Sequence, residues 1–261
     1  MALSVHTAKA LEKYQAEVDG AGSYGKQVEA ARVQFSRRNR IGNRAFDEVK
    51  STLDQMCAGA RRCMYCEDSA ADEVEHHHPK ALYPERVFTW SNYLYACGPC
   101  NGPKNSRFAV VGTNGDIVDV TLQRNAPIVR PQRGRSALLQ PREEDPLEYL
   151  QLDIAGGTFL FVPVDDPATR DRANYTVGLL HLNDRDHLPK ARREAYENYR
   201  ARLREYAAVR DAGAADATLR RMVAALLRAQ HPTVWQEMKR QRADIRELHE
   251  LFSRVPEALG W

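Results

Sequence analysis

The sequence predicts an α+β protein in which a short, metal-stabilised module is embedded in a mostly helical chain. Apolar residues recur at helical spacing in residues 1–60 and again in residues 176–261. Residues 61–108 are rich in Cys, His, Asn and Pro and follow neither a helical period nor a strand alternation, so we expect this segment to need a metal to fold. Residues 109–175 contain short β-like runs and are interpreted as a β-rich connecting region.

Three helices are predicted in the N-terminal helical region. The first two lie on either side of a break at Gly20–Gly22, and the third runs from Asn43 to Cys57. Their apolar residues at helical spacing are Leu11, Tyr14 and Val18, then Val28, Ala31 and Phe35, then Phe46, Val49 and Leu53.

The second half of the chain combines a predicted hairpin with further helices. Prolines at positions 127, 131, 141 and 146 interrupt an arginine-bearing connection. Glu148–Ile154 and Thr158–Val164 flank Ala155-Gly156-Gly157, a pattern typical of a β-hairpin. From about Asn183 the pattern becomes helical. The apolar stripes there, interpreted as core or partner surface, are Tyr196, Tyr199, Leu203 and Tyr206; Leu219, Met222, Val223, Leu226 and Leu227; and Met238, Ile245, Leu248 and Phe252.

Length and composition are those of an ordinary globular protein. The 261 residues are 43% hydrophobic and 28% charged, which allows a sizeable core. No run approaches roughly 18 consecutive apolar residues, so a membrane span is excluded. The first twelve residues carry His6, Lys9 and Glu12 and contain no secretory cleavage site, and we therefore expect a cytoplasmic protein.

The net charge of the chain is only +3, but basic residues are concentrated in two segments. Residues 36–40 form a basic cluster, and Arg130, Arg133 and Arg135 belong to a stretch, residues 124–142, that contains no acidic residue. Such runs attract phosphate backbones through counterion release, so these three arginines are candidate nucleic-acid contacts. The alternative interpretation is a solvated surface.

Two C-x-x-C pairs predict a structural zinc site. Cys63 and Cys66 form one pair, and Cys97 and Cys100 form the other. Two such knuckles supply the four thiolates of a tetrahedral shell that is closed to water. A redox pair is the alternative for one C-x-x-C, but two pairs without a thioredoxin-like βαβ pattern argue against it, and the expected reducing compartment argues against disulfides. Cys57 has no knuckle partner and is interpreted as a buried helix residue.

Histidine, asparagine and lysine residues cluster between and after the knuckles. The runs are Val74-Glu75-His76-His77-His78-Pro79-Lys80, Trp90-Ser91-Asn92-Tyr93-Leu94 and Cys100-Asn101-Gly102-Pro103-Lys104. Phosphodiester cleavage needs a base that activates water and a cation that absorbs charge on the phosphate and the leaving oxygen. A carboxylate, an imidazole and an amide oxygen gathered by a zinc site provide these parts.

These runs resemble the HNH (ββα-metal) endonuclease family, in its zinc-knuckle branch. The matching elements are E/D-H-x-x-P-K, a later W-x-N-x-L and a closing C-x-x-C-N-x-x-K, all within residues 63–108. The resemblance implies a ββα-metal centre that hydrolyses phosphodiester bonds with one divalent ion, Mg²⁺ or Mn²⁺, and leaves a 5′-phosphate and a 3′-hydroxyl.

The resemblance also implies a role for individual residues. His76 corresponds to the general base, and Asn92 to the asparagine that ties the ββ loop together and orients the base. Glu75 and Asn101 correspond to the ligands of the catalytic divalent ion. Glu75 is a longer ligand than the more common Asp, and Asn101 represents the asparagine variant of the last motif position. The remaining candidates, all for phosphate contact, are Lys80, Lys104 and His78.

Because the sequence contains three consecutive histidines, the one that acts as the general base has to be identified. In the family pattern a proline follows the base by three residues, and Pro79 therefore selects His76. The competing assignment makes His76 a ligand and His77 the base. In a regular strand Glu75 and His76 point to opposite faces, so they can serve one phosphate only if the strand ends in a twist or bulge. The remaining alternative is that the three histidines simply lie at the surface beside a zinc site.

The sequence therefore favours a metal-dependent endonuclease, with double-stranded DNA as the expected substrate and RNA as the alternative. The rival class is a zinc-dependent nucleic-acid-binding module without catalysis. A third possibility is a toxin-like or defence nuclease silenced by a partner. Residues 145–150 and 182–185 are similar to HNH subunits of bacterial anti-phage systems such as Septu, a resemblance that implies an ATPase subunit as partner.

Overall fold

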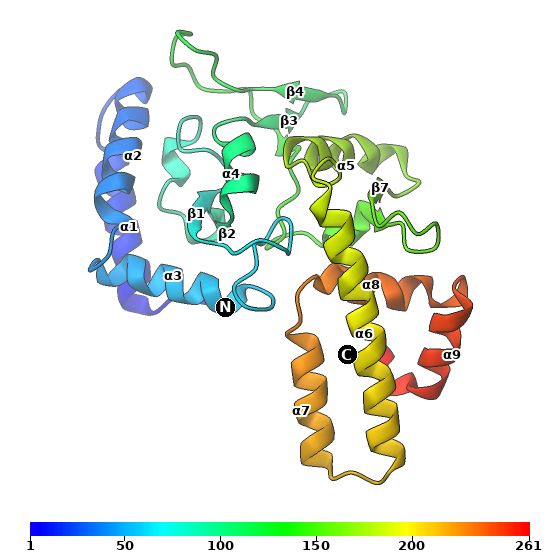
Figure 1. Cartoon of the computed structure of the whole chain (residues 1–261). Coiled ribbons are helices and arrows are strands. Elements are labelled where there is room, and N and C mark those ends of the chain that lie inside the picture. Colours follow the sequence, from blue (N-terminus) through cyan, green and yellow to red (C-terminus); the bar gives the residue numbers. More distant parts are fainter.

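The N-terminal segment up to Met56 forms three helices that pack beside the central module. The computed structural model describes residues 1–261, and these helices lie together at one side of the molecule (Figure 1). The side chain of Asn43 accepts hydrogen bonds from the backbone N–H groups of Ala45 and Phe46 and so caps the third helix, which was predicted between Asn43 and Cys57. The helices are α1 (Val5–Asp19), α2 (Tyr24–Arg38) and α3 (Arg44–Met56).

The central module is a two-stranded hairpin followed by a short helix. Strands β1 (Glu73–His76) and β2 (Tyr93–Ala96) are antiparallel, with Glu75 opposite Leu94 and His76 opposite Tyr93. Helix α4 (Gly98–Lys104) follows directly and packs against β1. The loop between the strands contains the 3₁₀ turns η1 (Pro84–Arg86) and η2 (Trp90–Asn92).

The connecting region contains two small sheets. The first has the strand order β4-β3-β5, and the second is the β6–β7 hairpin that the sequence predicts around Gly156-Gly157. The elements are β3 (Ala109–Val111), β4 (Ile117–Asp119), β5 (Arg135–Ser136), η3 (Pro146–Glu148), β6 (Leu150–Leu152) and β7 (Phe161–Pro163).

The C-terminal part is helical, and its helices begin earlier than predicted. Helix α5 starts at Pro167, with the Asp166 carboxylate accepting from the N–H of Ala168, whereas the sequence pattern placed the helical onset near Asn183. The elements are α5 (Pro167–Leu179), α6 (His187–Asp211), α7 (Asp216–Leu227), α8 (Pro232–Arg240), η4 (Gln241–Ala243), α9 (Arg246–Arg254) and η5 (Pro256–Gly260).

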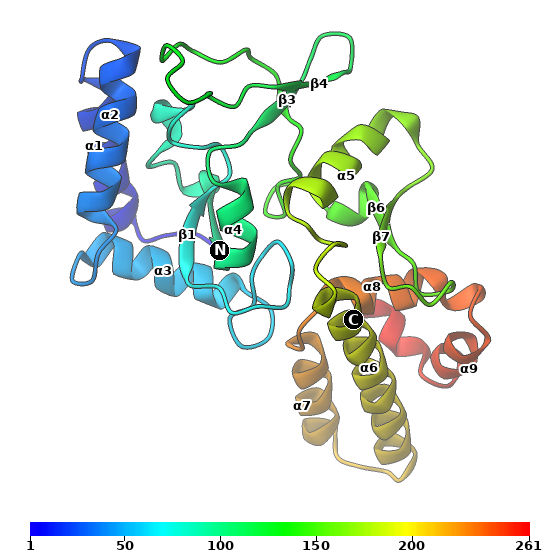
Figure 2. The ribbon, with the colours of Figure 1, turned by 45° about the horizontal axis from the view of Figure 1, so that its top comes forward.

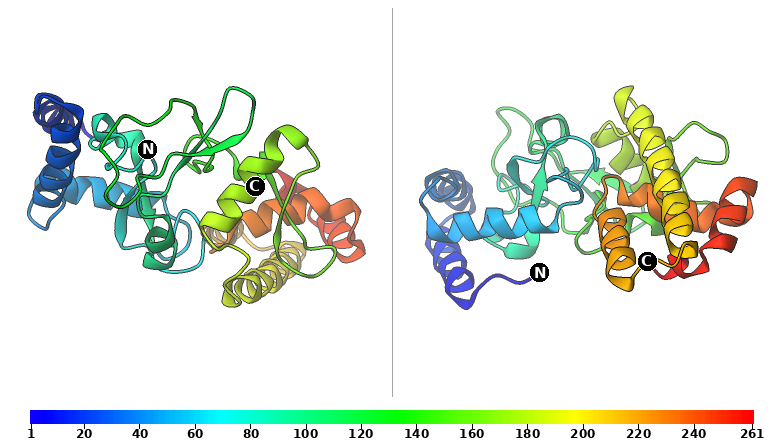
Figure 3. Two further views of the ribbon diagram at one scale, coloured as in Figure 1. Left: turned by 90° about the horizontal axis from the view of Figure 1, so that it is seen from above. Right: turned by 60° about the horizontal axis from the view of Figure 1, so that its bottom comes forward.

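Two apolar cores stabilise this α+β chain. One joins α1–α3 to the central module and includes Phe35, Phe46 and Tyr93; the other lies among α6–α9 and includes Tyr199 and Trp235. The two groups of helices lie at opposite ends of the molecule, and the small sheets and α5 lie between them (Figures 2 and 3). No helix combines the length and the apolar character that crossing a bilayer requires.

Candidate functional site

The four knuckle cysteines converge on one point. Their sulfur atoms lie within 4.8 Å of one another and all four residues are buried. Soft thiolate donors at this separation fit a tetrahedral Zn²⁺ ion, in agreement with the predicted structural metal site. Cys57 lies apart from them, half-buried, with its Sγ atom 3.3 Å from the carbonyl oxygen of Leu53.

The C-terminal half of the chain also contacts this cysteine cluster. The guanidinium of Arg185 donates to the Cys100 Sγ atom at 3.2 Å and to the carbonyl oxygen of Leu180 at 3.1 Å. Glu67, which directly follows Cys66, accepts from the hydroxyl of Thr233 at 2.7 Å. The first knuckle and Cys100 are therefore tied to the segment between α5 and α6 and to the start of α8.

His76 ends strand β1 with its ring enclosed by aromatic side chains. The ring centroid lies 4.3 Å from that of Phe35 and 5.2 Å from that of Tyr93. Its Nε2 atom lies 3.0 Å from the carbonyl oxygen of Val87. A carbonyl can only accept, so Nε2 carries the proton and Nδ1 holds the free lone pair. Burial, reinforced by the charge of Lys80, lowers the pKa of His76 to about 3, which keeps the imidazole neutral.

Glu75 and Lys104 form a buried ion pair between β1 and α4. The Lys104 ammonium contacts the Glu75 carboxylate and donates to the carbonyl oxygen of His76 at 2.8 Å. Burial raises the pKa of Glu75, and the Lys104 charge opposes that shift. Lys104 was a candidate phosphate contact, but its side chain is 0% exposed, so the structure corrects this interpretation: Lys104 holds the strand to the helix.

Asn92 closes the loop that separates the two strands. Its Oδ1 atom accepts from the backbone N–H of His78 at 2.7 Å. Its Nδ2 atom donates to the carbonyl oxygens of His78 at 3.1 Å and Arg86 at 3.0 Å. One amide therefore fastens the end of β1 to the loop that carries Val87, the hydrogen-bond partner of His76.

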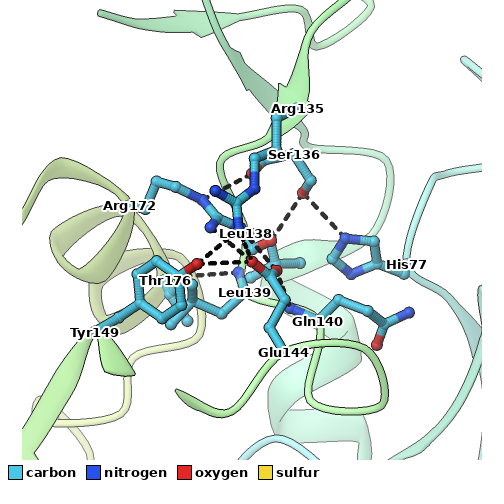
Figure 4. A network of polar contacts seen from close by, with 10 residues as sticks. All are labelled: His77, Arg135, Ser136, Leu138, Leu139, Gln140, Glu144, Tyr149, Arg172 and Thr176. Carbon is cyan, nitrogen blue, oxygen red and sulfur yellow. Dashed lines mark hydrogen bonds and ion pairs between the residues drawn. The ribbon is translucent and has the colours of Figure 1, made fainter. Parts of the chain in front are cut away.

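His77 points away from solvent into the connecting region (Figure 4). It is 1% exposed, and its Nε2 atom lies 3.0 Å from the hydroxyl of Ser136, which itself donates to the carbonyl oxygen of Leu138 at 2.8 Å. Ser136 must therefore accept from His77 Nε2–H, and the remaining Nδ1 atom is buried without a partner. Nδ1 of His76, by contrast, is not among the fully buried unpaired atoms. This geometry favours His76 over His77 as a base, because a base must reach water.

The polar network around Ser136 continues to Arg135, one of the candidate nucleic-acid contacts (Figure 4). Arg172 donates to the Ser136 carbonyl oxygen at 2.9 Å and to both carboxylate oxygens of Glu144, at 2.7 and 2.8 Å. Arg135 also donates to Glu144, at 2.5 Å, and to the hydroxyl of Tyr149 at 2.6 Å. Arg135 thus shares one carboxylate with Arg172, and its side chain remains 61% exposed, so contact with a phosphate stays a prediction for this residue.

The other two candidate arginines lie in the extended segment before β5. The Arg130 guanidinium is stacked 4.7 Å from the ring centroid of Tyr24, and Arg133 is exposed. Neither forms an ion pair, so both charges remain available at the surface.

His78 packs in an aromatic cluster beside Asn92. Its ring centroid lies 5.0 Å from those of Tyr83 and Phe108, and its Nδ1 atom lies 3.5 Å from the Arg86 guanidinium. Burial and the Arg86 charge lower the pKa of His78 to about 4, so it carries no positive charge for a phosphate at neutral pH.

A pocket of about 260 Å³ opens beside the end of β1. Glu75, His76 and Lys80 line it together, although the side chains of adjacent residues point to opposite faces of a regular strand. Asn101 is not among the lining residues: its side-chain amide donates to Glu73. Pro79 of the motif also lines the pocket, and the lining is completed by residues that no motif marks, namely Arg32, Ala81, Asn105 and Ser106.

The missed residues differ in how far the sequence could have indicated them. Asn105 and Ser106 directly follow the Asn101–Lys104 motif, and polar residues at the end of α4 were a usable signal. Arg32 lies on α2, outside every motif, and no local pattern connects it to the pocket.

Comparison with known proteins gives one partial relationship. No family model matches the chain, and no solved structure matches it. Over 70 residues the chain is 44% identical to the Septu protein PtuB of Bacillus thuringiensis. The matched segment covers 25% of this chain and 27% of the relative, so the chain spans about a quarter of that protein's length. The chain is thus related in part to a Septu protein.

Proposed function

We propose that the chain is a metal-dependent endonuclease of the HNH type that hydrolyses phosphodiester bonds. The observation that carries the proposal is the shared pocket of Glu75, His76 and Lys80, on a β1–β2–α4 unit clamped by four cysteines. A carboxylate, a neutral imidazole and an ammonium group are the parts that a hydrolytic phosphodiesterase requires.

His76 is the proposed general base. Nδ1 takes the proton of the attacking water, and the positive charge that develops on the ring is stabilised by the Nε2–H···O hydrogen bond to Val87. Asn92 has a positioning role, because its hydrogen bonds to His78 and Arg86 set the distance between β1 and the Val87 carbonyl.

Glu75 and Asn101 are the proposed ligands of a catalytic Mg²⁺ or Mn²⁺ ion. Both offer hard oxygen donors, which these ions prefer. Asn101 and Lys104 lie one turn apart on α4 and contact Glu73 and Glu75 respectively, two residues on one face of β1. Joint ligation of one ion by Glu75 and Asn101 requires the Asn101 side chain to turn from Glu73 toward Glu75. The ion, when bound, supplies Lewis-acid stabilisation of negative charge on the phosphate and the leaving oxygen.

Double-stranded DNA is the proposed substrate. Lys80 contacts the phosphate at the pocket, while the unpaired charges of Arg130 and Arg133 contact the backbone farther along. The partial identity to a Septu protein supports a role in anti-phage defence, and an ATPase subunit is the proposed partner.

One observation favours the rival function, a zinc-dependent nucleic-acid-binding module. The four cysteines are the only group of three or more Cys, His, Asp or Glu side chains that converges at metal-binding distance. Incubation of supercoiled plasmid with the native chain and magnesium separates the two functions. We expect nicked and linear DNA from the native chain and none from a His76→Ala variant of equal zinc content. Bound but uncut plasmid in both samples would favour the binding module.

A further inference from the structure

Arg32 forms a wall of the pocket beside Glu75 and His76, although it belongs to the N-terminal helices. Its position is fixed by the helix that carries it. Phe35, one turn farther along α2, packs against the ring of His76 at 4.3 Å between centroids. At the start of the same helix, the hydroxyl of Tyr24 donates to the carbonyl oxygen of Leu82 at 2.6 Å. The helix cannot move away from the pocket without breaking both contacts.

The pocket carries an excess of positive charge. Lys104 compensates Glu75, the only carboxylate among the lining residues. Lys80 and Arg32 form no ion pair, and both face the same cavity of about 260 Å³. Two uncompensated cations from separate elements make the pocket suited to an anion.

We propose that Arg32 and Lys80 together bind the phosphate group at this pocket, with Arg32 donating to its non-bridging oxygens. The planar guanidinium can donate two parallel hydrogen bonds to one phosphate, whereas the Lys80 ammonium acts as a point charge. The role of Arg32 in cleavage rests on the proposed nuclease function, but phosphate binding at the pocket does not. α2 thus supplies a substrate contact that the motif segment lacks.

Cleavage kinetics test the contribution of Arg32 to catalysis. Arg32→Gln should lower kcat/KM on duplex DNA by about 10²-fold, the scale for one donor to a reacting oxyanion. Arg32→Lys should recover part of the loss, because charge is kept while the bidentate geometry is not. Arg37→Gln is the matched control, since Arg37 is exposed on the same helix and does not line the pocket.

A binding measurement tests the pocket independently of cleavage. Inorganic phosphate is titrated into ¹⁵N-labelled full-length protein carrying His76→Ala, and the side-chain Nε–H signals of Arg32 and Arg37 are followed by NMR. We expect a saturable shift at Arg32 and none at Arg37, with the shift lost in Lys80→Gln. Phosphate binding at Arg32, together with a native chain that cuts no nucleic acid, would refute the nuclease function but not the anion pocket. No saturable shift at Arg32, or equal kinetics for Arg32→Gln and Arg37→Gln, would refute the role of Arg32.

Discussion

The Nε2 atom of His76 lies 3.0 Å from the carbonyl oxygen of Val87, across the loop that joins the two strands of the central hairpin. This contact fixes the tautomer of the imidazole and leaves Nδ1 as its basic nitrogen. Asn92 maintains the contact through its hydrogen bonds to the backbone of His78 and Arg86. The chemistry of the proposed base thus depends on a backbone carbonyl that no sequence motif marks.

The first prediction distinguishes the two adjacent histidines. His76→Ala should lower kcat by at least about 10²-fold, the scale of general-base catalysis, with zinc content unchanged. His77→Gln should retain most of the activity, because His77 is buried against Ser136 and does not line the pocket. An inactive His77→Gln protein with unchanged zinc content, together with an active His76→Ala protein, would make His77 the base instead of His76.

The second prediction concerns the metal ligands. Glu75→Ala and Asn101→Ala should each raise the magnesium concentration for half-maximal cleavage by at least about tenfold, because few protein ligands hold such an ion. Asn105→Ala should leave that concentration unchanged, although Asn105 lines the pocket. If Asn105→Ala alone changes the magnesium requirement, the amide ligand is Asn105.

The third prediction separates the arginines of the connecting region. Changing Arg130 and Arg133 to Gln should reduce the slope of log K against log salt by up to about two, since each phosphate contact contributes roughly 0.9. Arg135→Gln should change the slope less, because the Arg135 side chain is held by Glu144 and Tyr149. DNA-binding titrations between low and moderate salt measure these slopes. A slope lowered by Arg135→Gln alone would show that Arg135 leaves Glu144 for DNA.

The fourth prediction concerns the pH dependence of stability. Burial alone would raise the pKa of Glu144, but hydrogen bonds and charge from Arg172 outweigh it and hold the pKa at about 2, below the ordinary value of 4.5. The stabilisation is therefore fully present above pH 4.5 and is lost as the pH falls toward 2. Glu144→Gln should lower the free energy of unfolding by about 3 kcal/mol at pH 7, since it leaves the buried charge of Arg172 without its carboxylate partner.

Urea denaturation of both proteins at several pH values measures this difference. The difference in the free energy of unfolding between the parent and Glu144→Gln should shrink steadily below pH 4.5. Glu143→Gln, at the exposed neighbouring position, should match the parent at every pH. A gap that stays constant down to pH 3 would mean that the ion pair does not cause the stabilisation.

Elements with strong local signals were predicted accurately from the sequence. Helix α3 has an asparagine cap and apolar residues at helical spacing, and the β6–β7 hairpin surrounds a Gly-Gly pair. The onset of the C-terminal helices was wrong because α5 buries Arg172 and Thr176, so its buried face is partly polar and shows no apolar stripe. Asp166-Pro167, a cap followed by proline, was the signal that could have placed its start.

The functional site likewise combines features that the sequence predicted with features that it did not. Convergence of the four cysteines followed from their spacing, because two knuckles around one ion admit few geometries. The burial of Lys104 and the presence of Arg32 at the pocket depend on contacts between segments far apart in the chain. A single sequence carries no local record of such contacts.

The central claim, a nuclease with separate structural and catalytic metals, is tested most directly by metal analysis and an activity titration on one EDTA-treated sample. Brief, mild EDTA treatment should abolish plasmid cleavage while the protein stays folded with about one zinc per chain, because a closed four-thiolate shell exchanges slowly. Added magnesium or manganese should then restore cleavage without added zinc. Loss of zinc and activity together, with recovery of both on zinc alone, would contradict the account.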